Sequence, residues 1–156
     1  MLEKAVKLKV EGAGDNTIEA AMAKQVLADF FMKPGNPNAD LRKAEKILND
    51  SLTTLENAPD FTLGENWATT QGKLAHCMRM RGDYAGAMDT YGQALDVMLR
   101  TPQKDPAKMA QIQREYAQIL KDRGRLQDAN QLLTNPAQFR QNEKKNSQVA
   151  NSAGNP

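Results

Sequence analysis

The sequence predicts an all-α fold of three antiparallel helical hairpins stacked side by side, and two observations support this prediction. First, AHCMRMRGDYAGAMDTYGQAL at residues 75–95 and AQILKDRGRLQDANQLL at residues 117–133 align without gaps through a shared pattern. Second, apolar residues recur at helical spacing between Gly and Pro breaks, whereas strand-like alternation appears only at residues 6–10. A single helix–turn–helix unit therefore recurs along the chain.

The first hairpin is predicted over residues 17–56. Asn16 and Glu19 have the spacing of a capping box, which opens a helix over residues 18–32. Pro34 and Pro37 end that helix. Asp40 is then a suitable N-cap for a second helix, which runs to about residue 56 with its apolar residues on one face. This unit is a degenerate copy of the pattern above.

The second and third hairpins are predicted over residues 63–99 and 106–134. Thr62 opens a helix over residues 63–81, and Asp83 caps the helix over residues 84–99. Asp105, followed by a proline at the first helical position, opens the helix over residues 106–123. Gly82 and Gly124 suit the left-handed position that closes the first helix of each hairpin. The last helix covers residues 126–133.

The two ends of the chain differ from this repeat domain, residues 17–136. Residues 1–16 have an uncertain structure: a frayed helix, a strand or a remnant of cloning. Residues 137–156 are predicted to be a flexible polar tail, because beyond residue 140 their only apolar side chain larger than Ala is Val149. A linker or a partner-binding motif in this tail is the alternative.

The repeated residues resemble the tetratricopeptide repeat (TPR), whose signature places small and large residues at fixed spacings in two helices. The matching positions are Leu74, Ala75, Gly82, Ala87 and Tyr91 in the middle copy, and Ala117, Gly124 and Ala129 in the last. The signature Trp is absent. The spacing from Gly82 to Gly124 exceeds the usual period of about 34 residues, so the chain is most similar to the longer repeats of the kinesin-light-chain-like subgroup.

The resemblance implies a short right-handed superhelix whose first helices line a concave groove that holds a segment of a partner. By register, the groove-facing residues are Thr69, His76, Arg79, Gln111, Arg114, Gln118 and Lys121. Arg79, Arg114 and Lys121 would form a basic strip suited to an acidic or C-terminal carboxylate partner. The alternative is local: cations in the last turn of a helix interact favourably with its dipole. The Lys/Asn carboxylate clamp of chaperone-binding members is not reproduced.

Composition disfavours several other classes of function. The single His and single Cys exclude a His/Cys metal cluster, and no catalytic motif or cofactor-binding loop is present, so we expect neither an enzyme nor a cofactor. His76 and Cys77 are neighbours on a helix and point about 100° apart, so they cannot form a nucleophile–base pair. A net charge of +2 disfavours nucleic acid. No signal peptide or membrane-spanning segment is apparent, which predicts a cytoplasmic location.

The sequence therefore predicts a non-catalytic adaptor or scaffold that binds a peptide segment of a partner protein. Two alternatives stay open: a dedicated chaperone for a secreted or assembly-competent client, and a regulatory TPR domain of a larger enzyme or signalling protein. Three repeats are near the minimum for stability, so we also expect either a homodimer or a longer array that covers the end hairpins.

Overall fold

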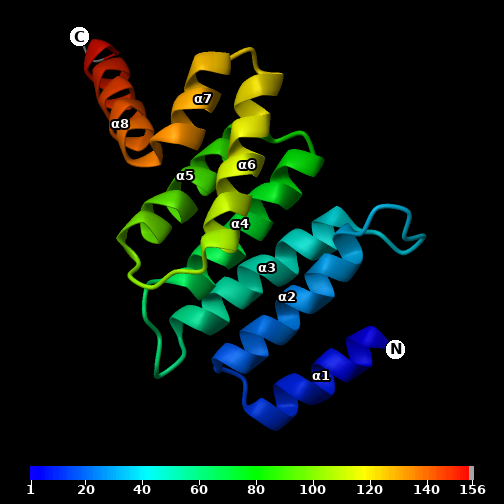
Figure 1. Ribbon diagram of the computed structural model, residues 1–156. Coiled ribbons are helices and arrows are strands. Elements are labelled where there is room, and N and C mark those ends of the chain that lie inside the picture. Colours follow the sequence, from blue (N-terminus) through cyan, green and yellow to red (C-terminus); the bar gives the residue numbers. More distant parts are fainter. Residues whose placement is uncertain (155–156) are drawn as a thin grey trace.

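The structure, a computed structural model, describes residues 1–154, and all regular secondary structure in this part of the chain is helical (Figure 1). The helices are α1 (Leu2–Ala13), α2 (Ile18–Met32), α3 (Leu41–Glu56), α4 (Glu65–Met80), α5 (Tyr84–Arg100), α6 (Pro106–Asp122), α7 (Leu126–Thr134) and α8 (Pro136–Ala153). The predicted all-α class is confirmed. The alternation at residues 6–10 does not form a strand, since those residues lie in α1.

Helices adjacent in the sequence pack as pairs, α2 with α3, α4 with α5 and α6 with α7. Each pair is joined by a short connection and its helices run in opposite directions (Figure 1). Successive pairs are joined mainly through contacts of α3 with α4 and of α5 with α6. No helix within residues 1–154 is long and apolar enough to cross a membrane.

Aspartate caps start three of these helices as predicted. The side chains of Asp40, Asp83 and Asp105 accept hydrogen bonds from first-turn backbone N–H groups at 2.8–3.0 Å. Two predicted capping boxes are wrong. Thr17, rather than Asn16, caps α2 and accepts from the Ala20 N–H at 3.1 Å.

The other capping box is absent because Glu65 makes different contacts. Helix α4 begins after Gly64 without a side-chain cap, so Thr62 plays no capping role. The Glu65 carboxylate accepts a hydrogen bond from the Asp105 backbone N–H at 2.6 Å and pairs with Lys108 at 2.5 Å. It thereby joins the start of α4 to the start of α6.

Small residues allow the paired helices to pack closely, and larger ones fill the space between them. The buried repeat positions are Leu74, Ala75, Ala87, Tyr91, Ala117 and Ala129. Gly82 and Gly124 have φ of 85° and 76°, the left-handed conformation that favours glycine at the end of α4 and α6. The buried residues form two clusters, one around α2, α3 and α4 and one around α4 to α8, with Trp67 and Met78 packed against both.

Helix α1 covers the outer side of the first hairpin. It packs against α2, and Val6 is its buried residue. Lys43 of α3 pairs with Glu3 across this contact. The N-terminal segment, whose structure the sequence leaves open, is therefore a docked helix.

Helix α8 contradicts the prediction of a flexible tail over residues 137–154; Asn155 and Pro156 lie outside the described residues. The reason lies in α7, which has only 9 residues and leaves part of the core uncovered. Asn135 caps the new helix, and Phe139, 1 % exposed, packs edge-on against Tyr116 with ring centres 5.5 Å apart. Arg140 binds Asp96 of α5 through two hydrogen bonds at 2.9 and 3.1 Å. The overall composition of the segment does not reveal these few specific contacts, which is why it predicted a flexible tail.

Candidate functional site: a groove between α2, α4 and α6

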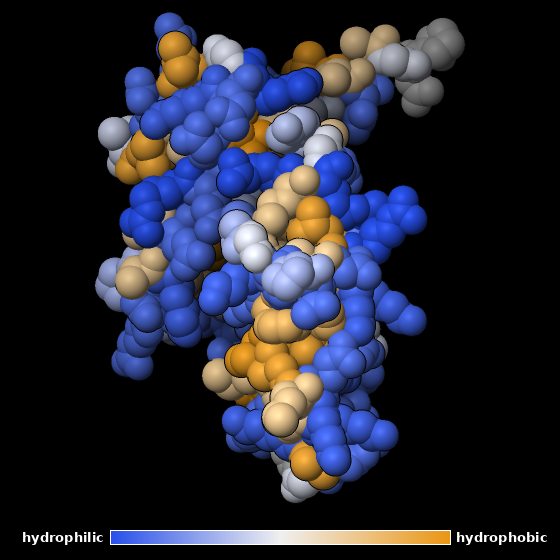
Figure 2. All heavy atoms as spheres, turned by 90° about the vertical axis from the view of Figure 1, so that its right-hand side faces the viewer, coloured by the Kyte–Doolittle hydropathy of each residue, from blue (hydrophilic) through white to orange (hydrophobic). Residues whose placement is uncertain are grey.

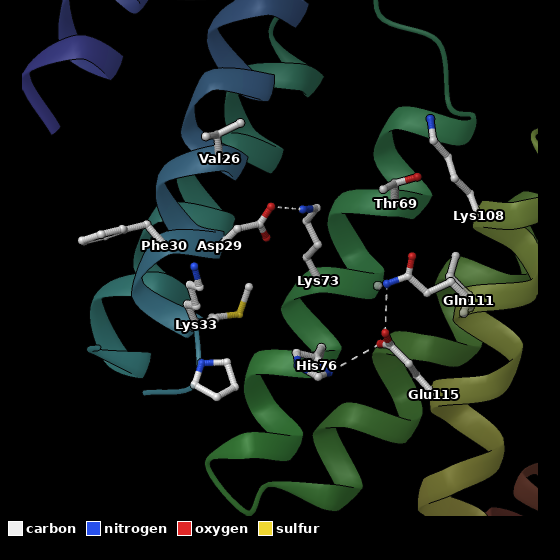
Figure 3. A pocket seen from close by; sticks show the side chains of 14 residues that line it. Val26, Asp29, Phe30, Lys33, Thr69, Lys73, His76, Lys108, Gln111 and Glu115 are labelled. Atoms are coloured by element: carbon white, nitrogen blue, oxygen red, sulfur yellow. Dashed lines mark hydrogen bonds and ion pairs between the residues drawn. The ribbon is translucent and has the colours of Figure 1, made fainter. Parts of the chain in front are cut away.

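The first helices of the three hairpins border one groove of about 600 Å³ (Figure 3). We call it the α2/α4/α6 groove; its lining extends from Val26 to Pro34, from Thr69 to His76 and from Lys108 to Glu115. Helices α4 and α6 meet at its floor. A Cβ on Gly72 would lie 3.2 Å from Cγ1 of Ile112, so glycine allows this close approach.

The wall formed by α2 carries apolar side chains beside the charged Asp29 and Lys33. Val26 is 54 % exposed, Phe30 is half-buried, and Met32 and Pro34 continue the lining. Val26 stays exposed because α2 packs against its neighbours through a different face, which includes Ala20, Ala21 and Ala28. Figure 2 shows apolar side chains gathered in the lower half of the face that it displays, where the N-terminal helices lie.

The opposite walls, on α4 and α6, are polar. Lys73 of α4 points across the gap and pairs with Asp29 of α2, while Lys108 is held by Glu65 (Figure 3). Lys33 adds a third ammonium group at the α2 side. The lining contains two carboxylates, Asp29 and Glu115, and Glu65 beside the groove neutralises Lys108, so the ionised side chains balance.

Glu115 is the best-connected group in the groove. Its carboxylate accepts hydrogen bonds from the Tyr91 hydroxyl at 2.7 Å and from the Gln111 amide at 3.0 Å, and His76 Nδ1 lies 3.6 Å away. Burial, reinforced by the Glu115 charge, raises the pKa of Tyr91, so the phenol stays protonated and donates. These partners hold the Glu115 carboxylate in place, so we treat it as a fixed part of the groove wall.

Two polar atoms on the α4 wall have no hydrogen-bond partner, Thr69 Oγ1 and His76 Nδ1. Both residues line the groove, two turns of helix apart. Buried polar groups are ordinarily satisfied, and an unpaired group costs free energy. Both atoms are buried, so a segment in the groove would reach them only after these side chains move.

The residues predicted for the groove divide into two sets. Thr69, His76 and Gln111 line it, on α4 and α6. The lining does not include Arg79, Arg114, Gln118 or Lys121. Arg114 and Lys121 are exposed, Gln118 is exposed and donates to Asp122 at 2.7 Å, and Arg79 is half-buried with its Nε unpaired. The predicted basic strip is therefore outside the groove.

Sequence reasoning missed the α2 wall, Lys73, Lys108 and Glu115. The apolar spacing that predicts the helix over residues 18–32 does not show which of its side chains stay exposed, and Met22 and Val26 do. One signal was available: the alanines at positions 20, 21, 23 and 28 mark the face that packs closely. The large apolar residues of α2 that lie off this face are then expected on a different surface of the helix.

Cys77 lies behind the groove and is buried. Its thiol donates to the Leu41 carbonyl at 3.2 Å, and burial raises the pKa of Cys77 to about 11. Within residues 1–154, no three His, Cys, Asp or Glu side chains are grouped so that they could hold a metal ion.

Comparisons with protein-family models, curated proteins and solved structures give no significant match to this chain.

Proposed function

We propose that the protein is a non-catalytic protein-interaction module that binds a segment of a partner protein in the α2/α4/α6 groove, and that its hairpins are TPR-like repeats. The observation that carries this proposal is a hollow of about 600 Å³ with the exposed Val26 of α2 on one side and polar side chains of α4 and α6 on the other (Figure 3). A hollow with one apolar and one polar side suits an amphipathic segment. The resemblance of the repeated residues to the TPR signature supports the same function.

The partner segment should combine apolar and acidic side chains. Burying Val26 against an apolar group removes apolar surface from water and stabilises the complex. Lys33 and Lys73 offer two accessible ammonium groups, whereas Glu115 already accepts hydrogen bonds from Tyr91 and Gln111, so we expect the segment to contribute carboxylates.

A displayed library of random peptides, each long enough to cross the groove, tests this function. Peptides enriched on the full chain are synthesised, and their affinities for variants are measured by calorimetry. Val26→Asn removes apolar contact at an exposed position and should weaken binding by about three- to tenfold. Val149→Asn, a comparable change at an exposed residue of α8, is the matched control and should leave affinity unchanged.

A double variant, Arg114→Ala/Lys121→Ala, tests the basic strip directly. We expect it to bind the selected peptides as the wild type does, because neither side chain lines the groove. Loss of binding in this variant, with Val26→Asn unaffected, would place recognition on the strip instead. Failure to enrich any peptide that depends on Val26 would contradict binding of a peptide segment in this groove.

A further inference from the structure

The Asp29–Lys73 ion pair spans the groove between the first two hairpins. Asp29 belongs to α2 and Lys73 to α4, and the two side chains point toward each other across the gap (Figure 3). The Lys73 side chain is 28 % exposed and that of Asp29 is 47 % exposed. The pair is thus accessible to a molecule that enters the groove.

The packing of the first hairpin on the second does not depend on this pair. Helix α2 is held by its partner α3, which in turn packs on α4. Leu74 and Cys77 of α4 share a buried cluster with residues of α2 and α3. A buried hydrogen bond from Gln25 to Thr70, at 2.8 Å, joins α2 to α4 directly. An accessible ion pair contributes little beside these contacts.

Lys73 is placed where a bound segment would pass. On α4 it lies between Thr69 and His76, whose unpaired polar atoms also belong to the groove wall. Lys108, by contrast, pairs with Glu65 at the start of α4, and Glu65 also binds the Asp105 backbone. The Glu65–Lys108 pair is therefore part of the framework, whereas Lys73 is the one side chain within residues 1–154 that pairs with the Asp29 carboxylate.

We propose that Asp29 is an internal substitute for a carboxylate of the partner: it occupies the Lys73 ammonium in the free protein, and an acidic side chain of the partner displaces it on binding. This inference rests on the proposed function of the groove. The exchange replaces one carboxylate–ammonium contact by another, so little electrostatic energy is gained. Asp29 also repels the incoming carboxylate. It should therefore weaken binding of acidic segments in the wild-type protein.

The proposal predicts that substitutions of Asp29 and of Lys73 change peptide affinity in opposite directions. The probes are the groove-binding peptides from the displayed library and synthetic counterparts in which every Glu and Asp is replaced by Gln or Asn. For the acidic peptides, Asp29→Asn should tighten binding, and Lys73→Met should weaken it, each by about three- to tenfold. With the amide counterparts, both effects should vanish.

Asp50→Asn is the matched control. Asp50 also pairs with a lysine across two helices, Lys24 at 2.8 Å, but neither residue lines the groove. This variant makes the same change of charge as Asp29→Asn. It should not produce the change in peptide affinity that we expect for Asp29→Asn. Thermal unfolding of each variant confirms that it is folded.

Three outcomes would overturn the exchange. Asp29→Asn and Lys73→Met could change affinity in the same direction, their effects could persist with the amide peptides, or the Val26-dependent peptides could lack acidic residues. In each case the pair is a structural link, and the groove keeps its proposed function. Absence of any Val26-dependent peptide would instead remove the proposed function itself.

Discussion

Gly92 lies in the interior of α5, where glycine ordinarily weakens a helix. The structure explains its presence, because the guanidinium of Arg140 rests against it. A Cβ at this position would lie 2.5 Å from Nη1 of Arg140. Because Asp96 holds that guanidinium, and both side chains are less than one-fifth exposed, the guanidinium cannot swing aside without breaking the pair.

Gly92→Ala should therefore destabilise the protein despite the better helix propensity of alanine. We expect a net loss of about 1–2 kcal/mol, because disturbing a largely buried ion pair outweighs the gain of about 1 kcal/mol in propensity. Urea unfolding measures the difference. Gly12→Ala in α1, where a Cβ meets nothing within 4 Å, is the control and should be neutral or stabilising. A stabilised Gly92→Ala would mean that Arg140 is not held in place.

The thiol of Cys77 should be unreactive in the folded protein. Thiolate is the reactive form, and with the pKa raised to about 11 almost none is present at neutral pH. Burial also blocks access. Reaction with a disulfide reagent should be slow in buffer and fast in denaturant. Rapid reaction without denaturant would show that the first and second hairpins separate readily, since Cys77 packs between them.

At the scale of elements, the docking of α8 should depend on pH through Asp96. Burial by itself would raise the pKa of this carboxyl, but hydrogen bonds and charge from Arg140 and Lys144 outweigh it and lower the pKa below 3.8. A carboxyl whose pKa is lowered in the folded state stabilises that state above its unfolded pKa. The stabilisation is lost as the pH falls through the folded value.

Asp96→Asn should accordingly reduce the free energy of unfolding at neutral pH by about 1–3 kcal/mol. The difference from wild type should shrink as the pH falls below 3.8, the ordinary value of the carboxyl. Denaturant unfolding of both proteins, from neutral pH to below 3.8, measures this difference in the free energy of unfolding. Asp89→Asn, an exposed neighbour on the same helix, should show no such dependence. A difference that is constant with pH would mean that the charge of Asp96 does not hold α8.

The elements that the sequence predicts well are those with explicit local signals. Asp40, Asp83 and Asp105 cap their helices, and two glycines with positive φ end α4 and α6, so the boundaries of α2 to α7 follow closely. Helix α8 has only one buried apolar side chain, Phe139, and its ion pairs are formed with residues distant in sequence. No local pattern contains that information.

The groove was only partly predictable for a related reason. Of the residues chosen by helical register, Thr69, His76 and Gln111 lie on its lining. Helical register alone could not distinguish large apolar side chains that pack against a neighbouring helix from those that remain exposed to solvent. On α2, that choice is made by the alanines, which allow close packing on the other face.

At the scale of the whole molecule, α1 and α8 cover the two ends of the stack. They occupy the surfaces for which the sequence suggested a second copy or further repeats. The terminal helices also differ in what they bury, Val6 in α1 and Phe139 in α8. The C-terminal end should therefore matter more for stability.

Truncation after Asn135 should destabilise the protein by about 3 kcal/mol or more, comparable with loss of a buried Phe side chain. It would uncover Tyr116 and leave Asp96 without Arg140. Truncation after Asn146 removes only exposed side chains within residues 147–154 and should have little effect. Thermal and urea unfolding of both chains measure this. Equal stability of the two would show that α8 is not part of the cooperative unit.

The division of the core into two clusters has a mechanical consequence. The clusters meet at α4, through Trp67 and Met78, while the second cluster continues without interruption from α4 to α8. Since the two termini lie at opposite ends of the stack (Figure 1), a force applied between them loads the joints between hairpins in series. The joint between α3 and α4, where the two clusters meet, is one of these joints. That joint also sets the distance between α2 and α4, so stretching the molecule would widen its groove.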